Sequence, residues 1–148
     1  MFNNYLCIIF IKNLSKLNQF IIFEIIPILL FCLLGSYFII NTNNFFAIYL
    51  TIELQSLALY VLIGIKNYSN LSIEAAFKYY ILGSFASCLI LFGIFIIYSV
   101  TGNTSFYAVA LCCSLNFYNI NYILGISVGF LFITVGFLFK LGVAPFHY

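Results

Sequence analysis

Four long apolar stretches constrain the fold of this chain more than any other feature of its sequence. Each is long enough to cross the hydrocarbon core of a bilayer, which is about 30 Å thick and takes about 20 helical residues. Because lipid offers the backbone no hydrogen-bond partners, such stretches must form helices. The sequence therefore predicts an all-α membrane protein with four transmembrane helices, over residues 20–40, 44–65, 73–100 and 120–144.

The composition agrees with a membrane environment. Charged residues make up 5% of the 148 residues and hydrophobic residues 66%. Soluble proteins carry about 25% charged residues, so this chain has too few ionisable side chains to cover its surface in water. The net charge of +2 is also too small to attract nucleic acid. We expect lipids as partners, and no nucleic acid.

The sequence contains no motif typical of a cofactor site. None of the five cysteines belongs to a C-x-x-C pair, and the single histidine, His147, has no ligand partner at zinc spacing. Neither a G-x-G-x-x-G sequence nor a phosphate-binding loop is present. We expect the cysteines to fill space between helices, and the chain to bind no metal, redox group or nucleotide.

The lysines outside the apolar stretches predict the orientation. Lys12 and Lys16 precede the first helix and Lys66 follows the second, whereas the other two connections carry no charge. By the positive-inside rule, the N-terminus and the loop at Lys66 face the inner side, which is the matrix in a mitochondrion. Residues 1–19 are then an interfacial or matrix-side extension, and residues 20–148 form the transmembrane domain.

The two uncharged connections differ in kind. Residues 41–44, Asn-Thr-Asn-Asn, form a tight polar turn that can cap the second helix. Residues 101–119 form a longer connection with an apolar patch from Phe106 to Leu115, which can lie flat on the membrane surface.

Glu53 is a carboxylate near the middle of the second helix, where a charge costs several kcal/mol unless it is paired, solvated or protonated. Tyr49, Ser56 and Tyr60 share its helical face, at positions i−4, i+3 and i+7. Glu53 can hold helices together as a buried polar group. Alternatively, it gains and loses a proton, because burial disfavours its charged form and a nearby lysine favours it.

Lys78 and Lys140 are the other ionisable residues of interest. Glu74 lies four residues before Lys78, the favourable order for an ion pair along a helix, although Lys78 could also be a lysine that extends to the interface. Lys140 shares a stripe with three glycines, including Gly136, which a neighbour or water can approach. A straight helix puts Lys140 near the inner interface, whereas a break at residues 134–136 would line a pathway.

Three separated motifs resemble NADH dehydrogenase subunit 2 of respiratory complex I. They are ELQSLALY at residues 53–60, EAAFKYYILGSFAS at residues 74–87 followed by LFGI at 91–94, and VGFLFKLGVAPFH at residues 135–147. They occur in the family's order with similar spacing. The residues Gln55, Ser56 and Leu57 favour subunit 2 over the related subunits and over antiporter subunits. The resemblance covers the chain from about residue 20 onward.

The resemblance implies a fold and a set of functional residues. The four helices correspond to helices four to seven of an antiporter-like repeat, of which the last is broken. Glu53, Lys78 and Lys140 match a midmembrane proton relay, with Tyr49, Ser56, Tyr60, Glu74 and Gly136 as supporting residues. The chain would be a non-redox subunit of a proton-translocating NADH:ubiquinone oxidoreductase of the mitochondrial inner membrane. That complex uses NADH, FMN, iron–sulfur clusters and ubiquinone elsewhere.

The sequence also departs from the family. The counterparts of the first three helices, of the eighth helix and of the whole second repeat are absent. We therefore expect a split subunit, in which a second polypeptide supplies the rest beside the other membrane-arm subunits of complex I. Two alternatives remain at this point: a structural or assembly protein without transport activity, and a cation/proton antiporter subunit.

Overall fold

The computed structural model describes residues 19–65, 70–115 and 119–143. These residues form the helices α2 (Gln19–Asn41), α3 (Phe45–Gly64), α4 (Asn70–Thr101), α5 (Phe106–Leu115) and α6 (Ile120–Leu141). All but the short helix α5 are long and apolar enough to cross a membrane. The predicted fold class, an all-α protein with four membrane-spanning helices, is confirmed.

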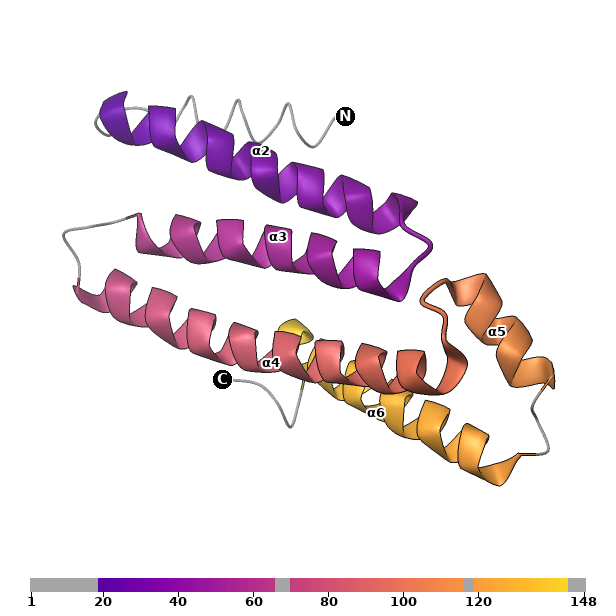
Figure 1. Ribbon diagram of the computed structural model, residues 1–148. Coiled ribbons are helices and arrows are strands. Elements are labelled where there is room, and N and C mark those ends of the chain that lie inside the picture. The colour runs from indigo at the N-terminus through magenta and orange to yellow at the C-terminus, as the bar shows by residue number, and fades with distance from the viewer. Residues whose placement is uncertain (1–18, 66–69, 116–118, 144–148) are drawn as a thin grey trace.

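The long helices form a layered bundle. Helices α2, α3 and α4 lie side by side, and α6 packs along the second half of α4 (Figure 1). The contact between α4 and α6 is the most extensive in the bundle, followed by the contacts of α3 with α2 and with α4. Helix α5 lies beyond the end of α4, at one end of the bundle. Helix α4 thus lies between α3 and α6, whereas α2 packs on α3.

Glycines bring the backbones of α4 and α6 into direct contact. A Cβ atom built on Gly93 would lie 2.6 Å from the carbonyl oxygen of Gly129, and one on Gly136 would lie 2.9 Å from the carbonyl oxygen of Ala86. Small residues are typical of close helix packing in membranes. The glycine stripe that the sequence indicated on the last helix is therefore a packing surface, and its neighbour is α4.

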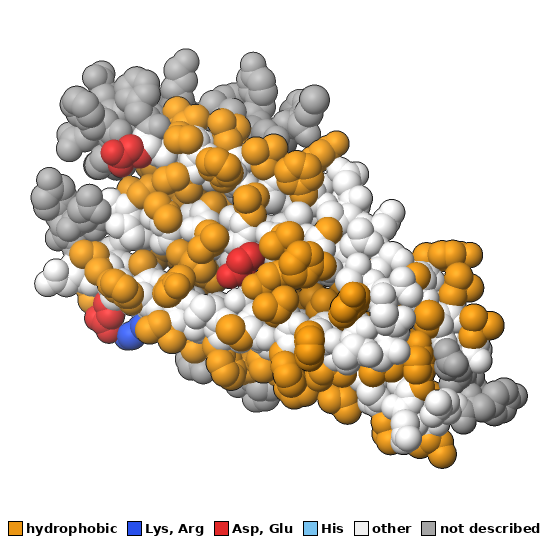
Figure 2. Space-filling model, in the orientation of Figure 1, with side chains coloured by type: hydrophobic (Ala, Val, Ile, Leu, Met, Phe, Trp, Pro, Cys, Tyr) orange, Lys and Arg blue, Asp and Glu red, His pale blue; other side chains and the backbone are white. Residues whose placement is uncertain are grey.

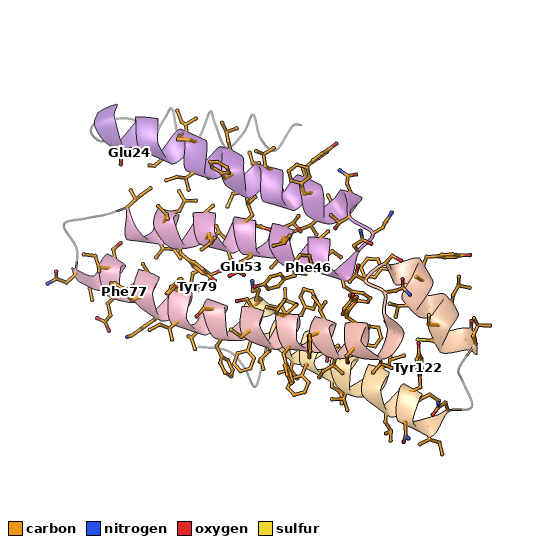
Figure 3. All side chains as sticks on the ribbon, in the orientation of Figure 1. Glu24, Phe46, Glu53, Phe77, Tyr79 and Tyr122 are labelled. Atoms are coloured by element: carbon orange, nitrogen blue, oxygen red, sulfur yellow. The ribbon has the colours of Figure 1, made fainter. Side chains whose placement is uncertain are left out.

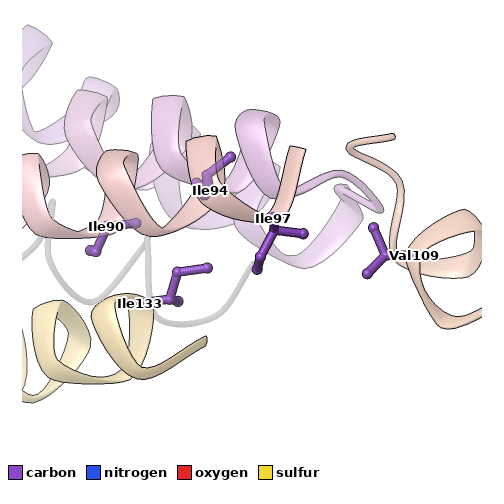
Figure 4. Close-up of a cluster of buried hydrophobic side chains, with 5 residues drawn as sticks. All are labelled: Ile90, Ile94, Ile97, Val109 and Ile133. Atoms are coloured by element: carbon purple, nitrogen blue, oxygen red, sulfur yellow. The ribbon is translucent and has the colours of Figure 1, made fainter. Parts of the chain in front are cut away.

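A cluster of isoleucines lies beside this seam. Ile90, Ile94 and Ile97 of α4 pack with Ile133 of α6 and Val109 of α5 (Figure 4). In a bilayer the surrounding lipid is as apolar as these side chains, so removal from water does not hold them together. Their stabilisation comes from close packing and from the many dispersion contacts that it permits.

Backbone hydrogen bonds tie two loops together at the α5 end of the bundle. The N–H of Phe45 donates to the carbonyl of Thr104 at 2.9 Å, and the N–H of Phe106 donates to the carbonyl of Asn43 at 3.1 Å. Asn44 is the N-cap residue of α3, but its side chain makes no capping hydrogen bond. The expected side-chain cap is therefore wrong, because the turn is held by the loop between α4 and α5 instead.

Helix α6 is continuous from Ile120 to Leu141, so the predicted break at residues 134–136 is wrong. The physical reason is that Gly136 packs against α4 and leaves no room for an opening. The helix ends at Gly142, which has a left-handed conformation with φ 62°. The N–H groups of Gly142 and Val143 donate to the carbonyls of Phe139 and Leu138, as is common where a glycine ends a helix.

Helix α6 ends partway along α4, and its last residue, Leu141, is exposed. Gly64, at the end of α3, lies beside Ala76 of α4, whereas Lys140 lines a cavity together with Gly83 of α4. Seven residues of helix separate Ala76 from Gly83, or roughly 10 Å at the helical rise. Lys140 therefore lies nearer the middle of α4 than the end of α3 does, and its depth relative to the inner interface stays a prediction.

Several predictions fall on residues outside the described ranges. They include the N-terminal extension at residues 1–18, the loop lysine Lys66 and the tail residue His147. The predicted orientation in the membrane depends on Lys12, Lys16 and Lys66, so it stays a prediction.

Candidate functional site

The structure brings Glu53 and Lys140 together. Glu53 lies near the middle of α3, and its Oε2 atom is 3.2 Å from Nζ of Lys140, whose ammonium group donates a hydrogen bond to it. The side chains of Lys140 and Glu53 are 14% and 25% exposed. Figure 2 shows an acidic side chain among hydrophobic ones in the middle of the face, with other charged side chains toward one end, and Figure 3 labels Glu53 there, between α3 and α4. The pair therefore joins α3 to α6 at the centre of the bundle.

The end of α6 favours this arrangement electrostatically. Lys140 lies in the last turn of the helix. The aligned peptide dipoles give that end a partial negative charge, which stabilises a cation. A carboxylate in an apolar environment in turn needs a partner of opposite charge. Each group thus supplies what the other requires, while the partial exposure leaves space for water beside them.

The polar stripe predicted on α3 faces the protein interior. Ser56 is 7% exposed and Tyr60 8%, and Tyr49 packs against the isoleucine cluster. The Ser56 hydroxyl donates to the backbone carbonyl of Glu53 at 3.0 Å, and not to its carboxylate. Such a bond satisfies a hydroxyl group within its own helix. Ser56 therefore contributes a small buried side chain to the site, and not a direct contact with the charge.

Lys78 pairs with Glu74 and not with Glu53. Its Nζ atom lies 2.5 Å from Oε1 of Glu74, and the two side chains are 71% and 59% exposed. The predicted pairing along the helix is confirmed. An exposed pair of this kind contributes about 0–1 kcal/mol to stability. The residues predicted to form the relay are therefore divided between a central pair and a separate exposed pair near the start of α4.

A cavity of about 540 Å³ lies where α6 ends. Helices α3, α4 and α6 all contribute to its wall, and the polar side chains that line it are Gln55, Ser56, Tyr60, Tyr79 and Lys140. Most of the wall is apolar, but a cavity of this size with several polar groups in its wall has room for water molecules. The sequence analysis missed Gln55 and Tyr79, because only the packing of α3 on α4 brings them to one cavity.

The site's chemistry is that of a carboxylate and an ammonium group. In the part of the chain that the structure describes, no group of three or more His, Cys, Asp or Glu side chains is placed to hold a metal ion. That the chain binds no cofactor stays a prediction. A paired acid and base beside a hydratable cavity can take up, hold and release protons.

Comparison with known proteins gives a consistent result. Residues 42–148 match the family described as NADH:quinone oxidoreductase/Mrp antiporter, transmembrane. The chain is 42% identical over 146 residues to NADH-ubiquinone oxidoreductase chain 2 of Marchantia polymorpha, an alignment that covers 96% of this chain and 29% of the relative. It is 45% identical over 132 residues to the same protein of Oenothera berteroana, covering 88% of this chain and 27% of that protein.

A bacterial relative extends the comparison. The chain is 40% identical over 124 residues to NADH-quinone oxidoreductase subunit N of Magnetococcus marinus, covering 84% of this chain. The alignment covers 25% of that relative. The chain thus spans between a quarter and three tenths of the length of these relatives.

Proposed function

Because this chain belongs to the NADH:quinone oxidoreductase/Mrp antiporter transmembrane family, we propose that it forms part of a proton-translocating membrane-arm subunit of NADH:ubiquinone oxidoreductase. In this role Glu53 and Lys140 form one element of a proton relay within the membrane. The chain takes part in the enzyme as a non-redox component, and the complex binds NADH, FMN, iron–sulfur clusters and ubiquinone elsewhere.

The observation that carries this proposal is the central pair of Glu53 and Lys140. The two atoms in contact are 3.2 Å apart and come from helices far apart in the sequence. At that distance and an effective dielectric constant of about 20, the attraction between unit charges is about 5 kcal/mol. An energy of this size is enough to decide whether a proton stays on the lysine or leaves it.

The pair acts by separation. While the charges are in contact, the carboxylate holds the proton on Lys140. When the two groups move apart, or when Glu53 takes up a proton, this attraction is lost and Lys140 releases its proton more readily. Water in the adjoining cavity is the acceptor that the proposal requires, and Gln55, Ser56 and Tyr60 provide it with hydrogen-bond partners.

The location and the partners are part of the proposal. Relatives named NADH-ubiquinone oxidoreductase chain 2 support a place in the mitochondrial inner membrane beside other subunits of the complex. The expectation that a second polypeptide carries the rest of such a subunit stays a prediction. Isolation of the complex through a tag on this chain, followed by mass spectrometry of the copurified subunits, tests it.

Replacing Glu53 by Gln tests the relay. In the assembled enzyme in its own membrane, we expect Glu53→Gln to reduce the pH gradient formed at a given rate of NADH oxidation. Glu74→Gln is the matched control, because Glu74 is also paired with a lysine but lies in an exposed pair. If Glu53→Gln leaves both assembly and proton transfer unchanged, the relay is wrong. Loss of assembly alone favours a structural role, and sodium transport independent of NADH favours an antiporter.

A further inference from the structure

Tyr60 separates two cavities of the bundle. The cavity at the end of α6, which Lys140 lines, has a volume of about 540 Å³. A second cavity, which is shallow and open to the surface, has a volume of about 300 Å³ and lies at the end of α3, where it is lined by Gly64, Ala76 and Phe77 among others. Of the described residues around the two cavities, Tyr60 alone lines both.

The Tyr60 ring is held in this position from several sides. Its edge-to-face contacts are with Tyr79, at 5.0 Å between ring centroids, and with Tyr80, at 5.5 Å. Its hydroxyl oxygen lies against the backbone of Gly83, where the Cβ atom of any other residue would collide with it. Tyr60 fits between α3 and α4 only because position 83 has no side chain.

The two cavities differ in polarity. Polar side chains line the first cavity from all three helices around it, whereas Val61, Ile73 and Phe77 contribute to the wall of the second. From the α3–α4 end of the bundle, the apolar cavity comes first and the Tyr60 ring lies between it and the cavity that Lys140 lines. The cavity beyond the ring can hold water beside Lys140.

We propose that Tyr60 is the barrier that controls access of water and protons from the α3–α4 end of the bundle to the Glu53–Lys140 pair. Rotation of its ring away from Gly83 joins the two cavities, and its return separates them. Tyr60 is a positioning residue for this path, because it touches neither charged group of the pair. The inference deepens the proposed function and rests on it for its role in proton transfer.

Cysteine labelling in the membrane-embedded complex tests the barrier. Leu59→Cys places a thiol in the first cavity and Ala76→Cys places one in the second. The reagent is a charged methanethiosulfonate, which does not cross the hydrocarbon core and is added on the side of the α3–α4 connection. Label on the parent chain is subtracted to correct for its native cysteines. We expect Leu59→Cys to react roughly tenfold or more slowly than Ala76→Cys, because an alternative open state of this kind is typically 0.1–10% populated.

Substitutions that remove or displace the Tyr60 ring should increase the labelling rate of Leu59→Cys and leave that of Ala76→Cys unchanged. Adding Tyr60→Ala should bring the labelling of Leu59→Cys to the rate of Ala76→Cys, whereas Tyr60→Phe, which keeps the ring, should leave it slow. Gly83→Ala provides a second route to the open state, because its Cβ atom displaces the ring. The proposal that Tyr60 is a barrier is wrong if Leu59→Cys reacts as fast as Ala76→Cys with Tyr60 in place. It is also wrong if neither Tyr60→Ala nor Gly83→Ala increases the rate.

The labelling experiment is independent of proton pumping. It needs no NADH, so it decides on the barrier even if Glu53→Gln leaves proton transfer unchanged. The role of the barrier in proton transfer has its own readout. At a given rate of NADH oxidation, Tyr60→Ala should lower the pH gradient more than Tyr60→Phe does, because phenylalanine loses only the hydroxyl and keeps the ring.

Discussion

The ammonium group of Lys140 lies 3.2 Å from the carboxylate of Glu53, across 87 residues of sequence. Lys78 is closer to Glu53 in the sequence, but it pairs with Glu74 on its own helix. The central pair and the exposed pair are therefore two chemically matched sites with very different surroundings.

Removing one partner of the central pair should destabilise the protein more than removing both. Lys140→Met leaves Glu53 as an unpaired, mostly buried carboxylate, which we expect to lower the free energy of unfolding by about 2–4 kcal/mol. Adding Glu53→Gln removes the unpaired charge and should restore at least half of that loss. Thermal unfolding of the purified complex in detergent measures both. Losses that simply add in the double variant contradict the pairing.

Changes to the exposed pair should have little effect on stability. Lys78→Met removes an ion pair whose two side chains are mostly exposed, so the expected loss is about 0.5 kcal/mol or less. It should also reduce proton transfer less than Lys140→Met does, as measured by the pH gradient at a matched rate of NADH oxidation. Equal loss of proton transfer in the two variants would show that Lys140 is not the main partner of Glu53.

The contact between α4 and α6 should not tolerate an added methyl group. Gly93→Ala forces its Cβ atom against the carbonyl oxygen of Gly129, a backbone atom that cannot turn away. We expect a loss of about 1–3 kcal/mol, as for other overpacked sites. Gly64→Ala is the matched control, because its Cβ atom would lie 3.5 Å from Ala76, an ordinary contact distance. Similar unfolding temperatures for the two variants would contradict the close packing.

The end of α6 should depend on the backbone conformation of Gly142. Its φ is 62°, and among the described residues no atom beyond its chain neighbours lies within 4 Å of a Cβ built there, so we expect the effect of Gly142→Ala to be conformational and not steric. We expect a loss of about 1 kcal/mol for Gly142→Ala and a smaller loss for Gly142→Asn, because asparagine tolerates this conformation better. Thermal unfolding of the two variants measures both losses of stability. An equal loss for both would mean that the helix end does not require the left-handed conformation.

The sequence predicted the helices well, because length and hydropathy alone decide which segments can span a membrane. It also placed Glu53 on a polar face with Ser56 and Tyr60, since helical periodicity determines which residues share a face. Both features depend on residues within one helix, and both agree with the structure.

The end of α6 and the partner of Glu53 could not be predicted in the same way. The apolar residues Val143 and Ala144 after Gly142 continue the hydropathy of the helix, so the glycine that ends it was not recognised as a cap. The choice between Lys78 and Lys140 depends on how deep α6 reaches beside α4. That depth follows from the glycine contacts between the two helices, which no pattern within one helix reveals.

The hydrogen bonds between the α2–α3 turn and the α4–α5 loop have a mechanical consequence. They fasten the start of α3 to the loop that follows α4, so a tilt of α3 about this end is one movement that leaves these bonds in place. Glu53 lies eight residues, or roughly 12 Å, from Phe45. A tilt of about 5° would displace Glu53 by about 1 Å, which takes its contact with Lys140 beyond hydrogen-bonding distance. A bundle pivoted at one end can thus make and break its central ion pair with a very small change of angle.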